Sequence, residues 1–201
     1  MTRRFYLGVT MGAALLSATG SGAVAFFAPH PRLLWNATPS APTGLYRLVP
    51  SAHPPTSTLV AIMPPRALAH LMAARRYLPL GVPLLKRVAA SPGARLCRHG
   101  GRVTVNGRLV AIAQARDSHG RSLPVWHGCQ RLAADYLFLL NPVPDSMDGR
   151  YFGPLPDAGL LGCALPILTR DAAQAPLRWH GFGTASACFP SQRKETNHGD
   201  R

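Results

Sequence analysis

The sequence predicts a mainly β protein, a β-rich α+β fold, with one apolar N-terminal helix and one short internal helix. Glycine and proline contribute 19 and 20 of the 201 residues, which favours many turns and short strands. Asn106-Gly107 lies between two apolar runs, a pattern typical of a β-hairpin. Because 47% of the residues are hydrophobic and only 15% are charged, the chain can bury a core.

The expected internal elements begin after residue 44. A helix is expected at residues 66–77, because Pro64 and Pro65 can open its first turn and Leu68, Leu71 and Met72 recur on one face. Strands are expected at residues 45–49, 57–63, 83–90 and 136–140, and a hairpin at residues 103–108 with residues 110–113 as its return strand.

The N-terminal segment, residues 5–28, carries no charged side chain. As a helix it would rise about 36 Å, enough to cross a hydrocarbon core of about 30 Å. Arg3 and Arg4 precede it, so the positive-inside rule places the rest of the chain outside the cytoplasm. We predict a transmembrane signal anchor, with a cleaved signal peptide ending at residues 23–25 as the open alternative. The expected location is the inner (cytoplasmic) membrane with a periplasmic domain, or the periplasm if the segment is cleaved.

Three regions follow from these patterns. Residues 1–28 are the predicted signal anchor, and residues 29–170 are the predicted folded domain. Residues 171–201 are mostly polar and without period, so a disordered tail is expected there.

The positive charge lies in the first half of the chain. No Asp or Glu precedes Asp117, whereas 14 Lys and Arg do; from Asp117 onward 8 basic residues face 8 acidic ones. Such asymmetry indicates an anionic partner, either nucleic acid or a lipid surface. The sequence contains no zinc-finger spacing, RNP-like strand or clear recognition helix. We therefore expect no direct nucleic-acid binding and expect the basic half to face anionic lipid headgroups.

The four cysteines have no C-x-x-C spacing, so neither a zinc site nor any other cofactor is expected. In an exported protein, disulfides become plausible. Cys97 and Cys129 flank one strand-rich insert and are the preferred pair, while free buried thiols remain the alternative.

Lysine is rare in this chain, which contains only Lys86 and Lys194. On a strand, Lys86 faces the same way as Leu84 and Val88, so its amine is expected in apolar surroundings. Burial lowers the pKa of a lysine, and a neutral amine can take a proton from a hydroxyl. A lysine at a strand edge with its head in water is the alternative.

Ser40 is the candidate hydroxyl. Pro39 and Pro42 stiffen its loop, and Gly44 permits an unusual φ or a close approach of a substrate backbone. A plain turn would have the same composition. Farther along, Asp148 and Arg150 are two residues apart and could form an ion pair that supports the site, or merely a surface turn.

Three segments resemble the serine-lysine signal peptidases: SAPTGLY at residues 40–46, LLKRVAASPG at 84–93 and SMDGRYFG at 146–153. The similarity is greatest to the TraF branch, the conjugative-transfer peptidases that mature pilin precursors, and it extends from the anchor to about Arg170. It implies a fold of curved antiparallel sheets around a short helix. Substrates of this family bind as extended strands.

The resemblance also implies the residue roles. Ser40 would be the nucleophile and Lys86 the general base, with Asp148 also important for activity. In supporting positions, Ser146 would orient Lys86 and Arg150 would brace the site with Asp148. Thr38 would supply a hydroxyl to the oxyanion.

Two positions depart from ordinary signal peptidases. Ala41 stands where they have methionine, which favours the TraF branch. Ala94 stands where an acidic residue usually follows the lysine motif, which leaves the predicted dyad unaffected.

The predicted function is a membrane-anchored serine endopeptidase that processes a pilin precursor, with head-to-tail cyclisation as a further outcome of the acyl-enzyme. Its expected partners are the pilin precursor or another exported protein, the inner membrane and type IV secretion components. Two alternatives stay open: a non-enzymatic anchored subunit of a conjugation or secretion channel, and a general signal peptidase I. A Ser-His-Asp enzyme is disfavoured, because no G-x-S-x-G motif accompanies the candidate histidines and aspartates. These are His70, His119, His127, Asp117 and Asp135.

Overall fold

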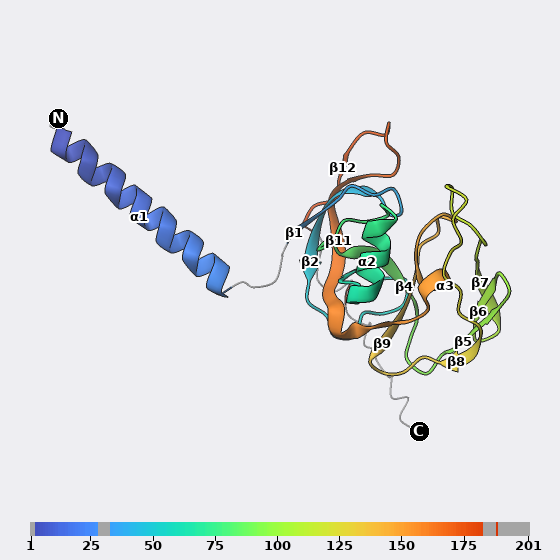
Figure 1. The fold of residues 1–201 in the computed structure, drawn as a ribbon. Coiled ribbons are helices and arrows are strands. Elements are labelled where there is room, and N and C mark those ends of the chain that lie inside the picture. The colour runs from blue at the N-terminus through green and yellow to red at the C-terminus, as the bar shows by residue number, and fades with distance from the viewer. Residues whose placement is uncertain (1–2, 28–32, 183–187, 189–201) are drawn as a thin grey trace, which may run out of the picture. The chain divides into compact units, whose positions relative to one another are not determined.

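The structure, a computed structural model, describes residues 3–27, 33–182 and 188 (Figure 1). The chain divides into two compact units, Met1–Pro31 and Arg32–Arg201. The first unit contains α1 (Arg3–Phe27), so a helix is present where the sequence predicts one. Among the described residues, no helix combines the length and the mean hydropathy that crossing a membrane requires. The helix is thus confirmed, whereas its transmembrane character remains a prediction.

The second unit is mainly β, as the sequence predicts. Its helices are α2 (Arg66–Ala74) and the single turn α3 (Gly149–Phe152), and a 3₁₀ turn covers Asp157–Gly159. The strands are β1 (Leu33–Asn36), β2 (Thr43–Val49), β3 (Leu59–Ile62), β4 (Leu84–Ala90), β5 (Arg95–His99), β6 (Arg102–Val105), β7 (Arg108–Ile112), β8 (Gly128–Arg131), β9 (Tyr136–Leu140), β10 (Leu155–Pro156), β11 (Leu160–Arg170) and β12 (Arg178–Trp179).

The strands form two antiparallel sheets. The larger has the order β1-β2-β11-β3-β4-β9-β10, with β12 paired to β11, and the smaller has the order β7-β6-β5-β8. Register shifts interrupt the ladders of β4 and β11. Because a bulge bends its strand and increases the local twist, these shifts curl the larger sheet. In Figure 1, β11 runs as the long orange strand beside β2.

Two apolar clusters organise this unit. In the first, Met72 of α2 packs against Val60, Ile62 and Val88 of β3 and β4, so the helix covers the sheet next to Lys86. The second cluster connects the two sheets and contains Ala90, Leu96, Val103, Leu132, Phe138 and Leu140.

The expected strands are found to within a few residues, but the short strands β1, β5, β8, β10 and β12 were missed, and so was β11. It is the longest strand and pairs with both β2 and β3. Gly162 and Pro166 interrupt its apolar pattern and conceal it in the sequence. The ladder shifts at both places, between Leu160 and Gly162 and between Pro166 and Leu168.

Two boundaries also differ from those predicted. The helix expected to reach residue 77 ends at Ala74, where the chain turns sharply through Arg75 and Arg76. The segment predicted as a polar tail, residues 171–201, contains β12, which pairs with Leu168 and Thr169 of β11. Residues 183–187 and 189–201 of that tail lie outside the described residues.

A disulfide joins Cys97 on β5 to Cys129 on β8, which are directly opposite each other in the smaller sheet. Cys163 and Cys188 are buried free thiols.

Candidate active site

The loop between β1 and β2 presents Ser40, and Asn36 fixes its shape. The buried Asn36 amide donates from Nδ2 to the carbonyls of Thr38 (2.9 Å), Ala41 (3.1 Å) and Pro42 (3.0 Å). Its Oδ1 accepts from Thr38 N (3.1 Å) and Thr38 Oγ1 (2.8 Å). One side chain therefore closes the whole turn around a half-buried Ser40. Our sequence analysis missed Asn36, although an Asn two residues before a Thr is a usual Asx-turn signal.

The far end of this loop is anchored by Gly44 and Tyr46. Gly44 has φ 141°, and a Cβ there would lie 2.1 Å from the Leu168 carbonyl oxygen. Only glycine allows β2 and β11 to approach so closely, so Gly44 accommodates the backbone of the protein itself and not that of a substrate. Tyr46 is buried and donates its hydroxyl to the Pro42 carbonyl at 2.6 Å.

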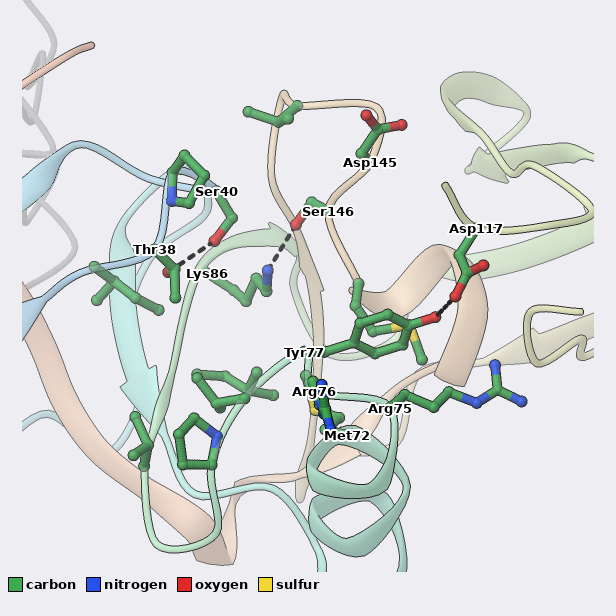
Figure 2. Close-up of a pocket in the computed structure, with 18 of the residues that line it drawn as sticks. Thr38, Ser40, Met72, Arg75, Arg76, Tyr77, Lys86, Asp117, Asp145 and Ser146 are labelled. Atoms are coloured by element: carbon green, nitrogen blue, oxygen red, sulfur yellow. Dashed lines mark hydrogen bonds between the residues drawn. The ribbon is translucent and has the colours of Figure 1, made fainter. Parts of the chain in front are cut away.

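Lys86 enters the site from β4 with only 3% of its surface exposed. Its Nζ donates to Ser146 Oγ at 2.6 Å, and Figure 2 shows it between the Ser40 loop and Ser146. Burial lowers the pKa of Lys86 from its ordinary 10.5 to about 8; the charge of Asp148 opposes this shift and that of Arg150 adds to it. A large share of the Lys86 amines is therefore neutral near pH 8.

A buried ion pair holds the loop that carries Ser146. Asp148 has no exposed surface and accepts from Arg150 Nε at 2.8 Å and Arg150 Nη2 at 3.0 Å. Arg150 also donates to the carbonyls of Asn141 (2.6 Å) and Pro144 (3.1 Å), and Asp148 accepts from Asn141 N (2.9 Å). The ion pair thereby ties residues 141–148 into one closed loop. Because Ser146 lies in this loop, the pair fixes the position of the hydroxyl that accepts from Lys86.

Asn141 connects this loop to the lysine strand. Its Nδ2 donates to the Leu85 carbonyl at 3.1 Å, one residue before Lys86. This link was absent from the sequence prediction, because no local pattern distinguishes Asn141 from an ordinary residue at the end of a strand.

The predicted site residues divide by position. A cavity of about 940 Å³ is lined by Thr38, Ser40, Lys86 and Ser146, which come from three separate segments. Asp148 and Arg150 lie behind it and do not line it. Among the described side chains, Lys86 Nζ is hydrogen-bonded to Ser146 and not to Ser40. The Ser40 hydroxyl instead lies 3.4 Å from Thr38 Oγ1.

The hydroxyl of Thr38 is already engaged. It must donate to Asn36 Oδ1, because a carbonyl oxygen can only accept. In this arrangement its proton points at the loop, and it would have to rotate before stabilising an oxyanion. The backbone N–H of Ser40 remains the other predicted donor.

The geometry fits acyl transfer. A hydroxyl and a lysine with a lowered pKa share one cavity, which is what activation of a serine by a neutral amine requires. The disulfide occupies the thiols of Cys97 and Cys129, which with His99 make up the one metal-sized group among the described residues.

A histidine-based triad is not formed at the neighbouring Asp-Ser-His sequence. Ser118 Oγ lies 3.3 Å from His119 Nδ1, but Asp117 accepts from the backbone N–H of His119. Within the described part of the chain, no hydrogen bond joins the Asp117 carboxylate to the imidazole ring, so the acid that should orient the base is missing.

A mainly β domain with a curled antiparallel sheet indicates a protein of the signal peptidase class, and comparison with known proteins shows that family. The sequence matches the signal peptidase family, peptidase S26, over residues 4–168, and the chain belongs to that family. It is 39% identical to a probable conjugal transfer protein TraF of Sinorhizobium fredii, over 77% of this chain and 85% of that relative. It is 38% identical to a conjugal transfer protein TraF of Agrobacterium fabrum, over 68% of this chain and 82% of the relative.

A similarity to a solved structure is weaker. A signal peptidase I from Enterococcus faecalis aligns with 55% of this chain and 95% of its own, at 19% identity and a TM-score of 0.31. The resemblance predicted from the three sequence segments is confirmed by the family match and by the TraF relatives.

Proposed function

We propose that this chain is a serine endopeptidase in which Ser40 is the nucleophile and Lys86 the general base. The observation that carries the proposal is the amine of Lys86, which is buried, has a pKa of about 8 and lines the same cavity as Ser40. A serine hydroxyl is a weak nucleophile unless an adjacent base accepts its proton.

In the proposed reaction, neutral Lys86 takes the proton of Ser40 while Ser40 Oγ attacks the peptide carbonyl. In the neutral amine, Nζ can donate to Ser146 and keep its lone pair free, so it can accept that proton once the Ser40 hydroxyl turns from Thr38 and comes within hydrogen-bond distance. Collapse of the tetrahedral intermediate transfers the proton to the leaving amine and leaves an ester on Ser40. Water or a second amine then attacks the ester, which gives hydrolysis or a new peptide bond.

We further propose that the substrate is a pilin precursor used in conjugal transfer. The support for conjugal transfer is the description of both relatives as conjugal transfer proteins. The open cavity suits an extended peptide, and an acyl-enzyme resolved by the pilin's own amino terminus would release a cyclic product.

Co-expression with the pilin precursor of the same transfer system tests this proposal. Wild type is expected to shorten the pilin, and cyclisation would lower its intact mass by one further water. Ser40→Ala and Lys86→Ala should both abolish processing. Ser118→Ala is the matched control, because Ser118 also lines the cavity and its chain neighbour Asp117 lies across the cavity from Ser40 in Figure 2. Processing that survives in either of the first two variants would exclude the dyad.

We also propose that α1 anchors the enzyme in the inner membrane with its second unit in the periplasm. The support is the uncharged run of residues 5–28 behind Arg3 and Arg4. After alkaline carbonate extraction, the full chain should remain with the membrane pellet, and residues 32–201 expressed alone should not. Release of the full chain into the supernatant would contradict the anchor.

A further inference from the structure

The C-terminal turn of α2 contains an arginine where glycine is the usual residue. Arg76 has φ 58°, its N–H donates to the Ala73 carbonyl at 3.0 Å, and the N–H of Tyr77 donates to the Met72 carbonyl at 2.8 Å. This is a Schellman motif with Arg76 at the left-handed position. A side chain is disfavoured there, and such conformations concentrate at functional sites.

A network of side chains fixes this turn against the loop of residues 117–122. Asp117 accepts from the hydroxyl of Tyr77 and from Arg121 Nε at 2.7 Å, and the Arg121 guanidinium lies 5.2 Å from the centre of the Tyr77 ring. Arg121 Nη2 donates to the Arg75 carbonyl at 3.2 Å, and Arg75 Nη1 donates to the Ser122 carbonyl at 2.7 Å. These contacts build one wall of the cavity, which holds the neighbouring backbone of Arg76 in place.

Arg76 takes no part in that network. Its side chain is exposed and lines the Ser40 cavity, and no hydrogen bond or ion pair reaches its guanidinium within the described ranges 3–27 and 33–182 or from residue 188. The carboxylate of Asp117 is already paired with Arg121. The cavity's other carboxylate, Asp145, belongs to the Ser146 loop and accepts from Gln114 Nε2 at 3.2 Å. In Figure 2, Asp145 lies at the opposite side of the cavity from Arg75 and Arg76.

We propose that Arg76 forms a subsite for a carboxylate of the peptide substrate, away from the bond that Ser40 attacks. The inference rests on the proposed peptidase function. An unpaired guanidinium directed into a peptide-sized cavity is suited to bind a carboxylate through paired N–H donors. The carboxylate can belong to an acidic side chain or to the peptide's C-terminus, which have the same chemistry. Arg76 is then a specificity-determining residue and not a catalytic one.

Peptide binding to the full-length Ser40→Ala protein tests the subsite without requiring cleavage. The probes are amidated, dansyl-labelled octapeptides of alanine and serine that carry a single Glu at successive positions, each with a Gln counterpart. A further pair compares a free C-terminal carboxylate with the amide. We expect one placement of the carboxylate to lower Kd about tenfold, as a charge-assisted hydrogen bond does. A lower Kd for one of the Glu peptides would identify an acidic side chain as the source of the carboxylate. A lower Kd for the peptide with a free C-terminus would identify the terminal carboxylate.

Variants of Arg76 then test whether the preference for a carboxylate comes from this side chain. Arg76→Gly should abolish the preference without lowering the unfolding midpoint, because glycine suits φ 58° better than arginine. Arg76→Lys should keep part of the preference, since the charge remains and the paired donors are lost. The control is Arg66→Ala at the start of the same helix, which is exposed, does not line the cavity and should keep the full preference.

Two results would overturn the subsite. One is equal affinity for both members of every acid and amide pair in the Ser40→Ala protein that keeps Arg76. The other is a preference for the acid that persists when Arg76→Gly is added. Cleavage of the pilin precursor by wild type is scored separately. Cleavage without any acid preference would refute the subsite alone, whereas an acid preference without cleavage would refute the peptidase assignment and leave a carboxylate-binding cavity.

Discussion

At the scale of single residues, the site depends on one amine placed where water cannot reach it. Lys86 is 3% exposed, so its ammonium form lacks most of the hydration that it would have at the surface. Ser146 gives it a single hydrogen bond, and the buried pair of Asp148 and Arg150 keeps Ser146 in place. The basicity of Lys86 is therefore set by burial, and its direction by the Ser146 loop.

This arrangement predicts the pH dependence of activity. The pKa of about 8 means that the neutral form of Lys86 increases as pH rises through 8. Below that pH, kcat/KM for pilin processing should rise about tenfold per pH unit, and above it should level off. A profile measured between pH 6 and 9.5 checks this, with Lys86→Arg as the inactive control, because arginine stays protonated. A flat profile over that range would contradict Lys86 as the general base.

From the sequence, the candidate residues of the site were predictable, but their hydrogen-bond partners were not. Rarity and strand position singled out Lys86, and two prolines singled out the loop of Ser40. Beyond the Asx-turn pattern with Thr38, no local pattern indicates that Asn36 makes five hydrogen bonds within that loop. Nor does any local pattern indicate that the Thr38 hydroxyl donates to Asn36.

At the scale of elements, the Ser40 loop depends on how closely β2 meets β11. Gly44 makes that approach possible, because a Cβ would lie 2.1 Å from the Leu168 carbonyl oxygen. We expect Gly44→Ala to lower the free energy of unfolding by about 3 kcal/mol, at the upper end of the usual range for overpacking. Pilin processing should fall with it, since the Ser40 loop ends at this contact.

Thermal unfolding of Gly44→Ala beside Gly100→Ala isolates the contact. Gly100 also has a positive φ, 58°, but no atom lies within 4 Å of the position of its Cβ. The Gly100 variant should therefore lose only about 1 kcal/mol from backbone strain. Equal losses in the two variants would show that the contact with β11 is unimportant.

Elements with a regular pattern were predicted well, and interrupted ones were not. The predicted strand at residues 136–140 coincides with β9, because five consecutive apolar residues leave little ambiguity. β11 carries a proline and a glycine inside its run, and its pairing with β2 and β3 stabilises it despite both. Tertiary hydrogen bonding overrode local propensity there.

At the scale of the whole molecule, the disulfide between Cys97 and Cys129 stabilises the smaller sheet. It connects β5 to β8 across a sequence separation of 32 residues. Closing a loop of that length limits the unfolded chain, so the double variant Cys97→Ala/Cys129→Ala should lose about 3–4 kcal/mol of unfolding free energy.

Chemical denaturation with and without dithiothreitol measures that loss. The reductant should destabilise wild type and leave the double variant unchanged, because Cys163 and Cys188 are free thiols. A wild-type midpoint that does not respond to reduction would mean that the bridge contributes nothing to stability.

By itself, the sequence determined the chemistry available to this protein: an uncharged N-terminal helix, a strand-rich domain, one rare lysine and one stiffened serine loop, in the order typical of the signal peptidase family. These features are local, since composition and periodicity act over a few residues. Only the tertiary structure decided which groups meet. It buried Lys86 beside Ser146, closed the Ser40 loop around Asn36 and left Arg76 unpaired in the cavity. Those outcomes depend on burial and on contacts between segments up to 60 residues apart, which no local pattern encodes.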